Sequence, residues 1–110
     1  MYKLCFFVPE SHLESVKSAL FKQGAGALGD YDRCAWQVLG HGQFRPLAGS
    51  KPFLGEALVH HNVEEYRVEM VVTNERIKGV IECLLSIHPY EQPAYEYWQV
   101  NASLDSISYV

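Results

Sequence analysis

Residues 2–8 limit the fold of this chain more than any other segment, because they are apolar on both alternating faces. The two apolar sets are Tyr2, Leu4, Phe6 and Val8 on one face, and Cys5 and Phe7 on the other. A strand of this kind is buried on both sides, so we expect it in the middle of a sheet. The sheet must then carry apolar material on both of its faces.

A helix is expected directly after this strand. Ser11 and Glu14 match the capping box that opens many helices. Apolar residues then recur at helical spacing, at Leu13, Val16, Leu20 and Phe21. The pattern predicts a helix over 11–23 that Gly24 and Gly26 stop. The run 24–29 also spells G-x-G-x-x-G, but it follows a helix instead of opening one, so it predicts no dinucleotide site.

The rest of the chain supplies a second, longer unit of strands and one helix. The expected elements are a half-buried strand at 31–39, a turn at 40–42, a short returning strand beginning at 43–45, a long ordered loop at 46–62, a strand at 64–72, a helix at 74–87 capped by Thr73 or Asn74, and an aromatic strand at 94–100. A long loop inside a small domain is often functional.

The resulting order, β-α-β-β-α-β, is that of the ferredoxin-like split βαβ fold of the α+β class. Both helices then pack on one face of an antiparallel sheet whose first and third main strands are central. We expect one domain over 1–110, with a core at 2–100 and a C-terminal tail or edge strand at 101–110. The other sheet face would carry Cys5, Phe7, Val71 and either Tyr97 or Trp98, and an apolar second face is typical of a subunit interface.

Composition excludes several classes of function. The chain of 110 residues has a net charge of -4, and its nine Lys and Arg residues are scattered, which argues against a nucleic-acid partner. No apolar run approaches the roughly 20 residues that span a bilayer. The N-terminus lacks the pattern of a signal peptide, so a cytoplasmic location is expected. The cysteines at 5, 34 and 83 are widely spaced and are expected to be buried and reduced.

Two segments carry the candidate ligand or interface residues. The segment 44–55 contributes Phe44, Arg45, Pro52 and Phe53, and the turn at 88–93, which contains two prolines, contributes His88, Tyr90 and Glu91. A cation beside aromatic rings suits an anionic group, and a carboxylate and imidazole on a stiff turn suit a ligand or a subunit contact. A purely structural turn is the alternative. If the chain were a small enzyme, its cleft would be expected between the 44–55 loop and the 88–93 turn.

Binding of a divalent metal is the first alternative, ahead of a small enzyme. His60, His61 and Glu64 offer imidazole and carboxylate ligands, and His88 with Glu91 offers another pair. The spacing of the first group, on a loop that enters a strand, is not diagnostic of a metal site. No cofactor is expected beyond such a metal.

The sequence resembles a known domain. F-R-P-L-x-G-x-x-P-F-x-G at 44–55 and H-P-Y-E-x-P-A-Y at 88–95, together with V-P-E at 8–10 and G-A-G at 24–26, resemble the domain inserted in the middle of YqfO-type proteins. The resemblance covers about residues 2–100. It implies the PII/CutA-like fold, whose members form trimers around their sheets. The full-length relatives are hexameric rings with a dinuclear metal centre, described as GTP cyclohydrolase type 2-like.

These 110 residues do not include the metal-bearing flanking domains of such relatives. We therefore expect no enzyme activity, and in particular no GTP hydrolysis. The expected function is that of a non-catalytic, homo-oligomeric binding or regulatory module, a trimer rather than a dimer, with a protein partner as a further expectation. A CutA-like divalent metal-binding protein and a small enzyme are the alternatives.

Overall fold

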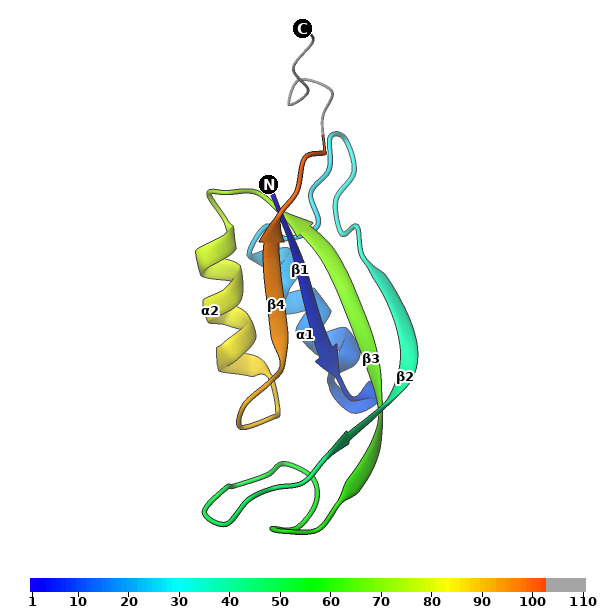
Figure 1. Ribbon diagram of the computed structural model, residues 1–110. Coiled ribbons are helices and arrows are strands. Elements are labelled where there is room, and N and C mark those ends of the chain that lie inside the picture. Colours follow the sequence, from blue (N-terminus) through cyan, green and yellow to red (C-terminus); the bar gives the residue numbers. More distant parts are fainter. Residues whose placement is uncertain (103–110) are drawn as a thin grey trace, which may run out of the picture.

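The computed structural model describes residues 1–102, and these form the predicted order of elements (Figure 1). The elements are β1 (Tyr2–Val8), α1 (Glu10–Lys22), β2 (Trp36–Phe44), β3 (His61–Val72), α2 (Ile77–Ile87) and β4 (Tyr95–Gln99). The expected tail or edge strand at 101–110 lies, from residue 103 onward, outside the described residues. In the part that is described, no helix is long and apolar enough to cross a membrane.

The sheet has the strand order β2-β3-β1-β4 with antiparallel pairing, so β1 and β3 are central as predicted. Leu4 lies opposite Met70 and Phe6 lies opposite Val68. Both helices cover the face that these residues share (Figure 1). The core between sheet and helices consists of Leu4, Phe6, Val8, Leu13, Val16, Leu20, Val68, Met70, Val72, Val80 and Leu84. Burying each large side chain contributes roughly 1.5–3 kcal/mol of hydrophobic stabilisation, which holds the two layers together.

The end of α1 follows the glycine prediction. Gly24 adopts a φ of +98°, its N–H donates to the Phe21 carbonyl at 3.0 Å, and the Ala25 N–H donates to the Leu20 carbonyl at 3.1 Å. These two bonds form a Schellman motif, which satisfies carbonyls that the helix leaves free.

The predicted N-caps are wrong for both helices. Because α1 begins at Glu10, its N-cap is Pro9, and the Ser11 hydroxyl lies 2.8 Å from His12 Nδ1 instead of capping the helix. Residues 74–76 form a turn, so α2 begins only after Arg76, and no side chain among residues 1–102 caps it. Asn74 instead accepts a hydrogen bond from the N-terminal amine of Met1 at 2.6 Å. The Asn74 side chain, which local sequence predicted to cap α2, therefore makes a tertiary contact instead.

The prediction for β2 is also wrong. Instead of a strand at 31–39, a turn at 40–42 and a returning strand at 43–45, a single strand pairs with β3 along its whole length, from Trp36 opposite Glu69 to Phe44 opposite His61. Gly40 and Gly42, which were predicted to form a turn, lie within this strand. The Glu65 side chain lies across β2, and a Cβ at Gly42 would collide with Glu65 Oε1. Gly42 therefore permits a close approach within a strand, and β3 starts earlier than the predicted residue 64.

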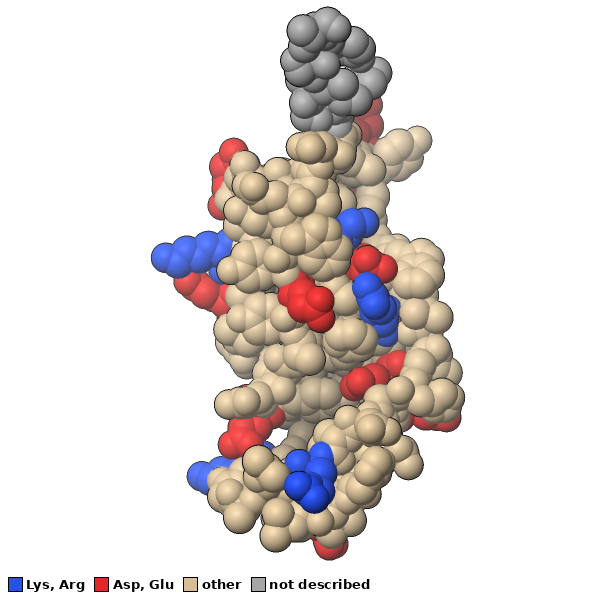
Figure 2. All heavy atoms as spheres, in the orientation of Figure 1, with Lys and Arg blue, Asp and Glu red and all other residues tan. Residues whose placement is uncertain are grey.

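The second sheet face, which we call the open face, is not covered by the helices (Figure 1). The strand register places on it Lys3, Cys5, Phe7, Trp36, Val38, Arg67, Glu69, Val71, Glu96 and Trp98. Trp36 is 57% exposed, Val38 44% and Trp98 41%. Figure 2 views the molecule from this side and shows uncharged atoms interrupted by single charged side chains of both signs. The expected apolar second face is present and includes Trp98, whereas Tyr97 lies on the other face, edge-on to Tyr2.

Candidate functional site

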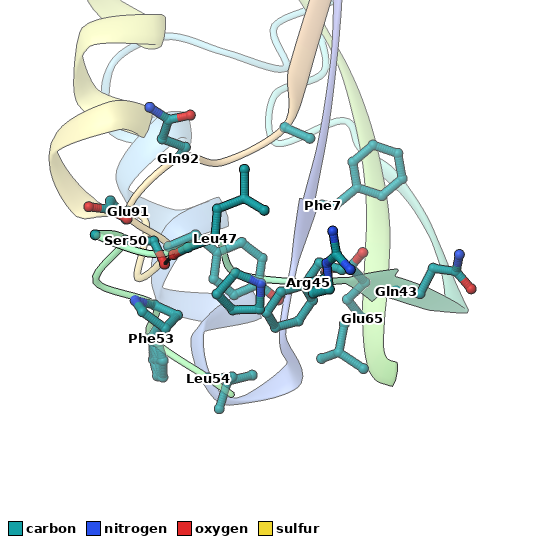
Figure 3. Close-up of a pocket in the computed structure, with 17 residues that line it drawn as sticks. Phe7, Gln43, Arg45, Leu47, Ser50, Phe53, Leu54, Glu65, Glu91 and Gln92 are labelled. Atoms are coloured by element: carbon teal, nitrogen blue, oxygen red, sulfur yellow. Dashed lines mark hydrogen bonds between the residues drawn. The ribbon is translucent and has the colours of Figure 1, made fainter. Parts of the chain in front are cut away.

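A hollow of about 770 Å³ lies where the loop after β2 meets the turn before β4 (Figure 3). Its walls come from residues between 43 and 54, from residues between 90 and 94, and from Phe7, Val63 and Glu65 of the sheet. The predicted candidates Phe44, Arg45, Pro52, Phe53, Tyr90 and Glu91 all line it. The fold therefore brings together two segments that sequence analysis had singled out separately.

The loop and the turn are joined by a direct hydrogen bond. The Lys51 N–H donates to Glu91 Oε1 at 2.9 Å. The Phe53 ring also meets the Tyr90 ring edge-on, with centroids 6.4 Å apart, and meets the His12 ring of α1 at 5.4 Å. These contacts hold the loop over the end of β1 and give the hollow its outer wall.

The His88 side chain supports the turn from behind and does not line the hollow. It is 7% exposed, and its Nε2 lies 2.6 Å from the Phe7 carbonyl, so Nε2–H is the donor. Its Nδ1 accepts the Tyr90 N–H at 3.1 Å. Burial lowers the pKa of His88 below its ordinary value, although the bond to Phe7 opposes this effect. Both ring nitrogens of this predicted candidate are bonded to backbone groups, so His88 supports the turn and does not face a ligand in the hollow.

The Tyr90 side chain connects the turn to the sheet. Its hydroxyl donates to Glu65 Oε2 at 3.0 Å. Burial raises the pKa of Tyr90 strongly, and the neighbouring Glu65 carboxylate raises it further. The phenol therefore stays protonated at physiological pH. Its hydroxyl acts as a hydrogen-bond donor that holds the Glu65 carboxylate in place beside the hollow.

Arg45 is the cation of the lining. It follows the last residue of β2 and is exposed, and Figure 3 shows it in the middle of the lining side chains, with Leu47 on one side and Gln43 and Glu65 on the other. Within residues 1–102, the ion pairs are Lys17 with Glu14 and Arg67 with Glu69, so none involves Arg45. Its guanidinium is available to a ligand.

The metal candidates do not converge. The His61 ring stacks on Phe44 with centroids 5.6 Å apart, and its Nε2 accepts the Glu56 N–H at 2.8 Å. The His60 Nε2 lies 3.2 Å from Asn62 Oδ1. Glu64 lies opposite His41, on the sheet face opposite to that of His61. In residues 1–102 no three His, Cys, Asp or Glu side chains are grouped to hold a metal ion. Metal binding stays a prediction.

Sequence reasoning did not assign Phe7, Val63 or Glu65 to this site. They lie on central strands, where an apolar or alternating pattern indicates only burial. The one available signal was the pair of glycines in β2, because glycine in a strand often marks the close approach of another side chain.

Comparison with curated proteins relates the chain to one set of relatives. It is 39% identical over 98 residues to the GTP cyclohydrolase 1 type 2 homolog of Halalkalibacterium halodurans. It is 42% identical over 98 residues to that of Bacillus subtilis. Both matches cover 89% of this chain and only 26% of the relative, so the chain spans about a quarter of the curated relatives' length. No protein-family model matches the chain.

Solved structures give the same relationship and extend it to the fold. A Bacillus cereus protein related to NIF3 matches with a TM-score of 0.77 and 33% identity, covering 91% of this chain and 25% of that one. The divalent cation tolerance protein CutA from Archaeoglobus fulgidus matches with a TM-score of 0.67 and 14% identity, covering 94% and 88%. The PII-like protein CutA from Nostoc matches with a TM-score of 0.67 and 18% identity, covering 96% and 88%. The predicted similarity to a segment of the first set of proteins, and the PII/CutA-like fold, are confirmed.

Proposed function

We propose that this domain is a non-catalytic module that binds a small molecule in the hollow and works as a homo-oligomer. The observation that carries the proposal is the hollow itself. Two segments far apart in the sequence form its walls, and the bond between Lys51 and Glu91 joins them. Concave, largely apolar sites with a few convergent polar groups are typical of small-molecule binding.

The chemistry of the lining favours binding over catalysis. The Glu65 carboxylate accepts from Tyr90 and the Glu91 carboxylate accepts from Lys51, so both are used in holding the walls. The nearby imidazole of His88 is buried and engaged at both nitrogens. A general base needs a free lone pair within reach of a substrate. The His88 imidazole has none, and each carboxylate has one oxygen engaged in holding the walls.

The open face supports assembly. Trp36, Val38 and Trp98 expose apolar surface on it, and exposed apolar patches often mark interfaces. Between them lie Lys3 and Arg67 together with Glu69 and Glu96, charges of both signs that a second copy of the same face can complement. The resemblance to PII and CutA proteins favours three copies over two.

Light scattering at micromolar concentration tests the assembly. We expect a mass that is a multiple of the 12.5 kDa chain, and a monodisperse monomer would contradict the proposal. Trp36→Asp should dissociate the assembly by placing a charge in the interface. The matched control is Leu85→Asp on α2, whose side chain is 47% exposed away from the open face. It should leave the mass unchanged.

Amide NMR spectra with a library of small organic fragments test the binding part. We expect shift changes confined to residues 43–54 and 90–94 and to Phe7, Val63 and Glu65 of the sheet. A library that leaves these amides unperturbed, or perturbs them no more than the rest of the chain, would contradict the assignment of the hollow as a binding site.

A further inference from the structure

We infer that the ligand of the hollow is a hydrophobic monocarboxylate, with its carboxylate on Arg45 and its ring or chain against the aromatic wall. This inference rests on the proposed binding function and names the chemical class of the ligand. Two properties of the lining carry it: the available guanidinium and the balance of charges around it.

The walls select an apolar body. Phe7 of β1, Phe44 of β2, and Leu47, Phe53 and Leu54 of the loop line the hollow with apolar side chains. Three of these residues belong to the loop that the Lys51–Glu91 bond ties down. Flat, well-positioned rings of this kind favour ligands with a ring or a compact aliphatic chain.

Arg45 selects a planar anion. Its neighbours in the chain are fixed: the Phe44 ring stacks on His61, and the buried Pro46 accepts a hydrogen bond from the Leu58 N–H through its carbonyl. The stem of Arg45 therefore starts from an ordered backbone. A guanidinium presents parallel N–H donors that match the two oxygens of a carboxylate. Among residues 1–102 it has no acidic partner within ion-pair distance.

The surrounding charges limit the ligand to one negative charge. Among the described residues, the lining holds one cation, Arg45, and two carboxylates, Glu65 and Glu91. A single anionic group can satisfy Arg45, whereas a phosphate chain would place further negative charge near the two glutamates. Like charges brought together in a partly desolvated site are repelled. The lining therefore disfavours nucleoside triphosphates.

Calorimetry with 3-phenylpropionate and its uncharged amide, 3-phenylpropanamide, tests the inference on the full chain. We expect the wild-type chain to bind the acid at least about tenfold more tightly than the amide. Arg45→Gln should remove this preference and leave the affinity for the amide unchanged. Lys78→Gln, which removes an exposed cation on α2, is the matched control and should keep the preference. Amide NMR spectra of each variant verify that it is folded.

The possible outcomes distinguish a failure of the carboxylate inference from a failure of the proposed small-molecule binding. Equal affinity for acid and amide, or a preference that survives Arg45→Gln, would overturn the carboxylate inference while leaving small-molecule binding in place. Tighter binding of ATP than of the acid would overturn the limit to one negative charge. The absence of binding of acid, amide and ATP at about 1 mM, together with an unperturbed fragment spectrum, would overturn the proposed binding function itself.

Discussion

The hydroxyl of Tyr90 donates a hydrogen bond to Glu65 Oε2 at 3.0 Å, which ties the turn before β4 to the central strand β3. Tyr90→Phe deletes this bond and leaves the ring in place. We expect the free energy of unfolding to fall by about 1.5–3 kcal/mol, because a hydrogen bond to a charged acceptor is lost. Urea denaturation measures the change. Tyr31→Phe is the control, since the Tyr31 side chain is 75% exposed, and it should have no effect. Equal stability of all three proteins would show that the bond contributes nothing.

Gly42 and Gly40 form a matched pair for the close approach of Glu65. Gly42→Ala places a Cβ against Glu65 Oε1, so we expect a loss of about 1–3 kcal/mol in the free energy of unfolding. Gly40→Ala meets no atom within 4 Å and should be neutral or slightly stabilising, because alanine loses less backbone entropy on folding. Adding Glu65→Ala to the Gly42 variant should restore part of the loss. If the two alanine variants are equally stable, Glu65 does not lie across β2.

His88 makes the stability depend on pH. Its folded-state pKa lies below the ordinary value of 6.5, so the folded protein binds this proton less readily than the unfolded chain does. The contribution of neutral His88 to the free energy of unfolding is therefore fully present above about pH 6.5. It is lost as the pH decreases toward the lowered pKa, by about 1.4 kcal/mol per unit of pKa difference.

Thermal melting between about pH 7.5 and about pH 5.5 measures this loss. His88→Gln should flatten the dependence, and His60→Gln, at an exposed position, should retain it. His12, whose charge lowers the pKa of His88, provides a second variant. His12→Gln should weaken the dependence. A pH profile that His88→Gln leaves unchanged would assign the effect to another group.

The bond from the Lys51 N–H to Glu91 Oε1 should control the order of the loop. Glu91→Ala removes the acceptor, and we expect hydrogen exchange at the amides of residues 47–54 to accelerate several-fold, with little change in the sheet. Glu82→Ala, an exposed substitution on α2, is the control. Unchanged exchange in Glu91→Ala would mean that the aromatic contacts of Phe53 alone hold the loop.

Much of the fold could be predicted because its signals are local. The alternating apolar faces of β1, the helical spacing from Leu13 to Phe21 and the glycine stop at Gly24 each require only neighbouring residues, and each prediction is confirmed. The order of elements then limits the topology, which places β1 and β3 in the centre of the sheet. Two of the failures are at positions whose partners are distant in the chain. Local sequence predicted a turn at Gly42 because it does not report the approach of Glu65 from β3. It predicted a cap at Asn74 because it does not report the contact of Asn74 with the N-terminus.

The sequence by itself determined the α+β class, the central position of β1 and β3 and the two segments, 44–55 and 88–93, in which chemically useful side chains gather. Only the tertiary structure decided that these segments enclose one hollow, that Glu65 and Phe7 complete it, and that His88 stands behind it. The physical reason is that periodicity reports which face of an element is buried. Which side chains share a cavity depends on the curvature of β2 and β3 and on hydrogen bonds such as that of Lys51 to Glu91, which form only once the strands have paired.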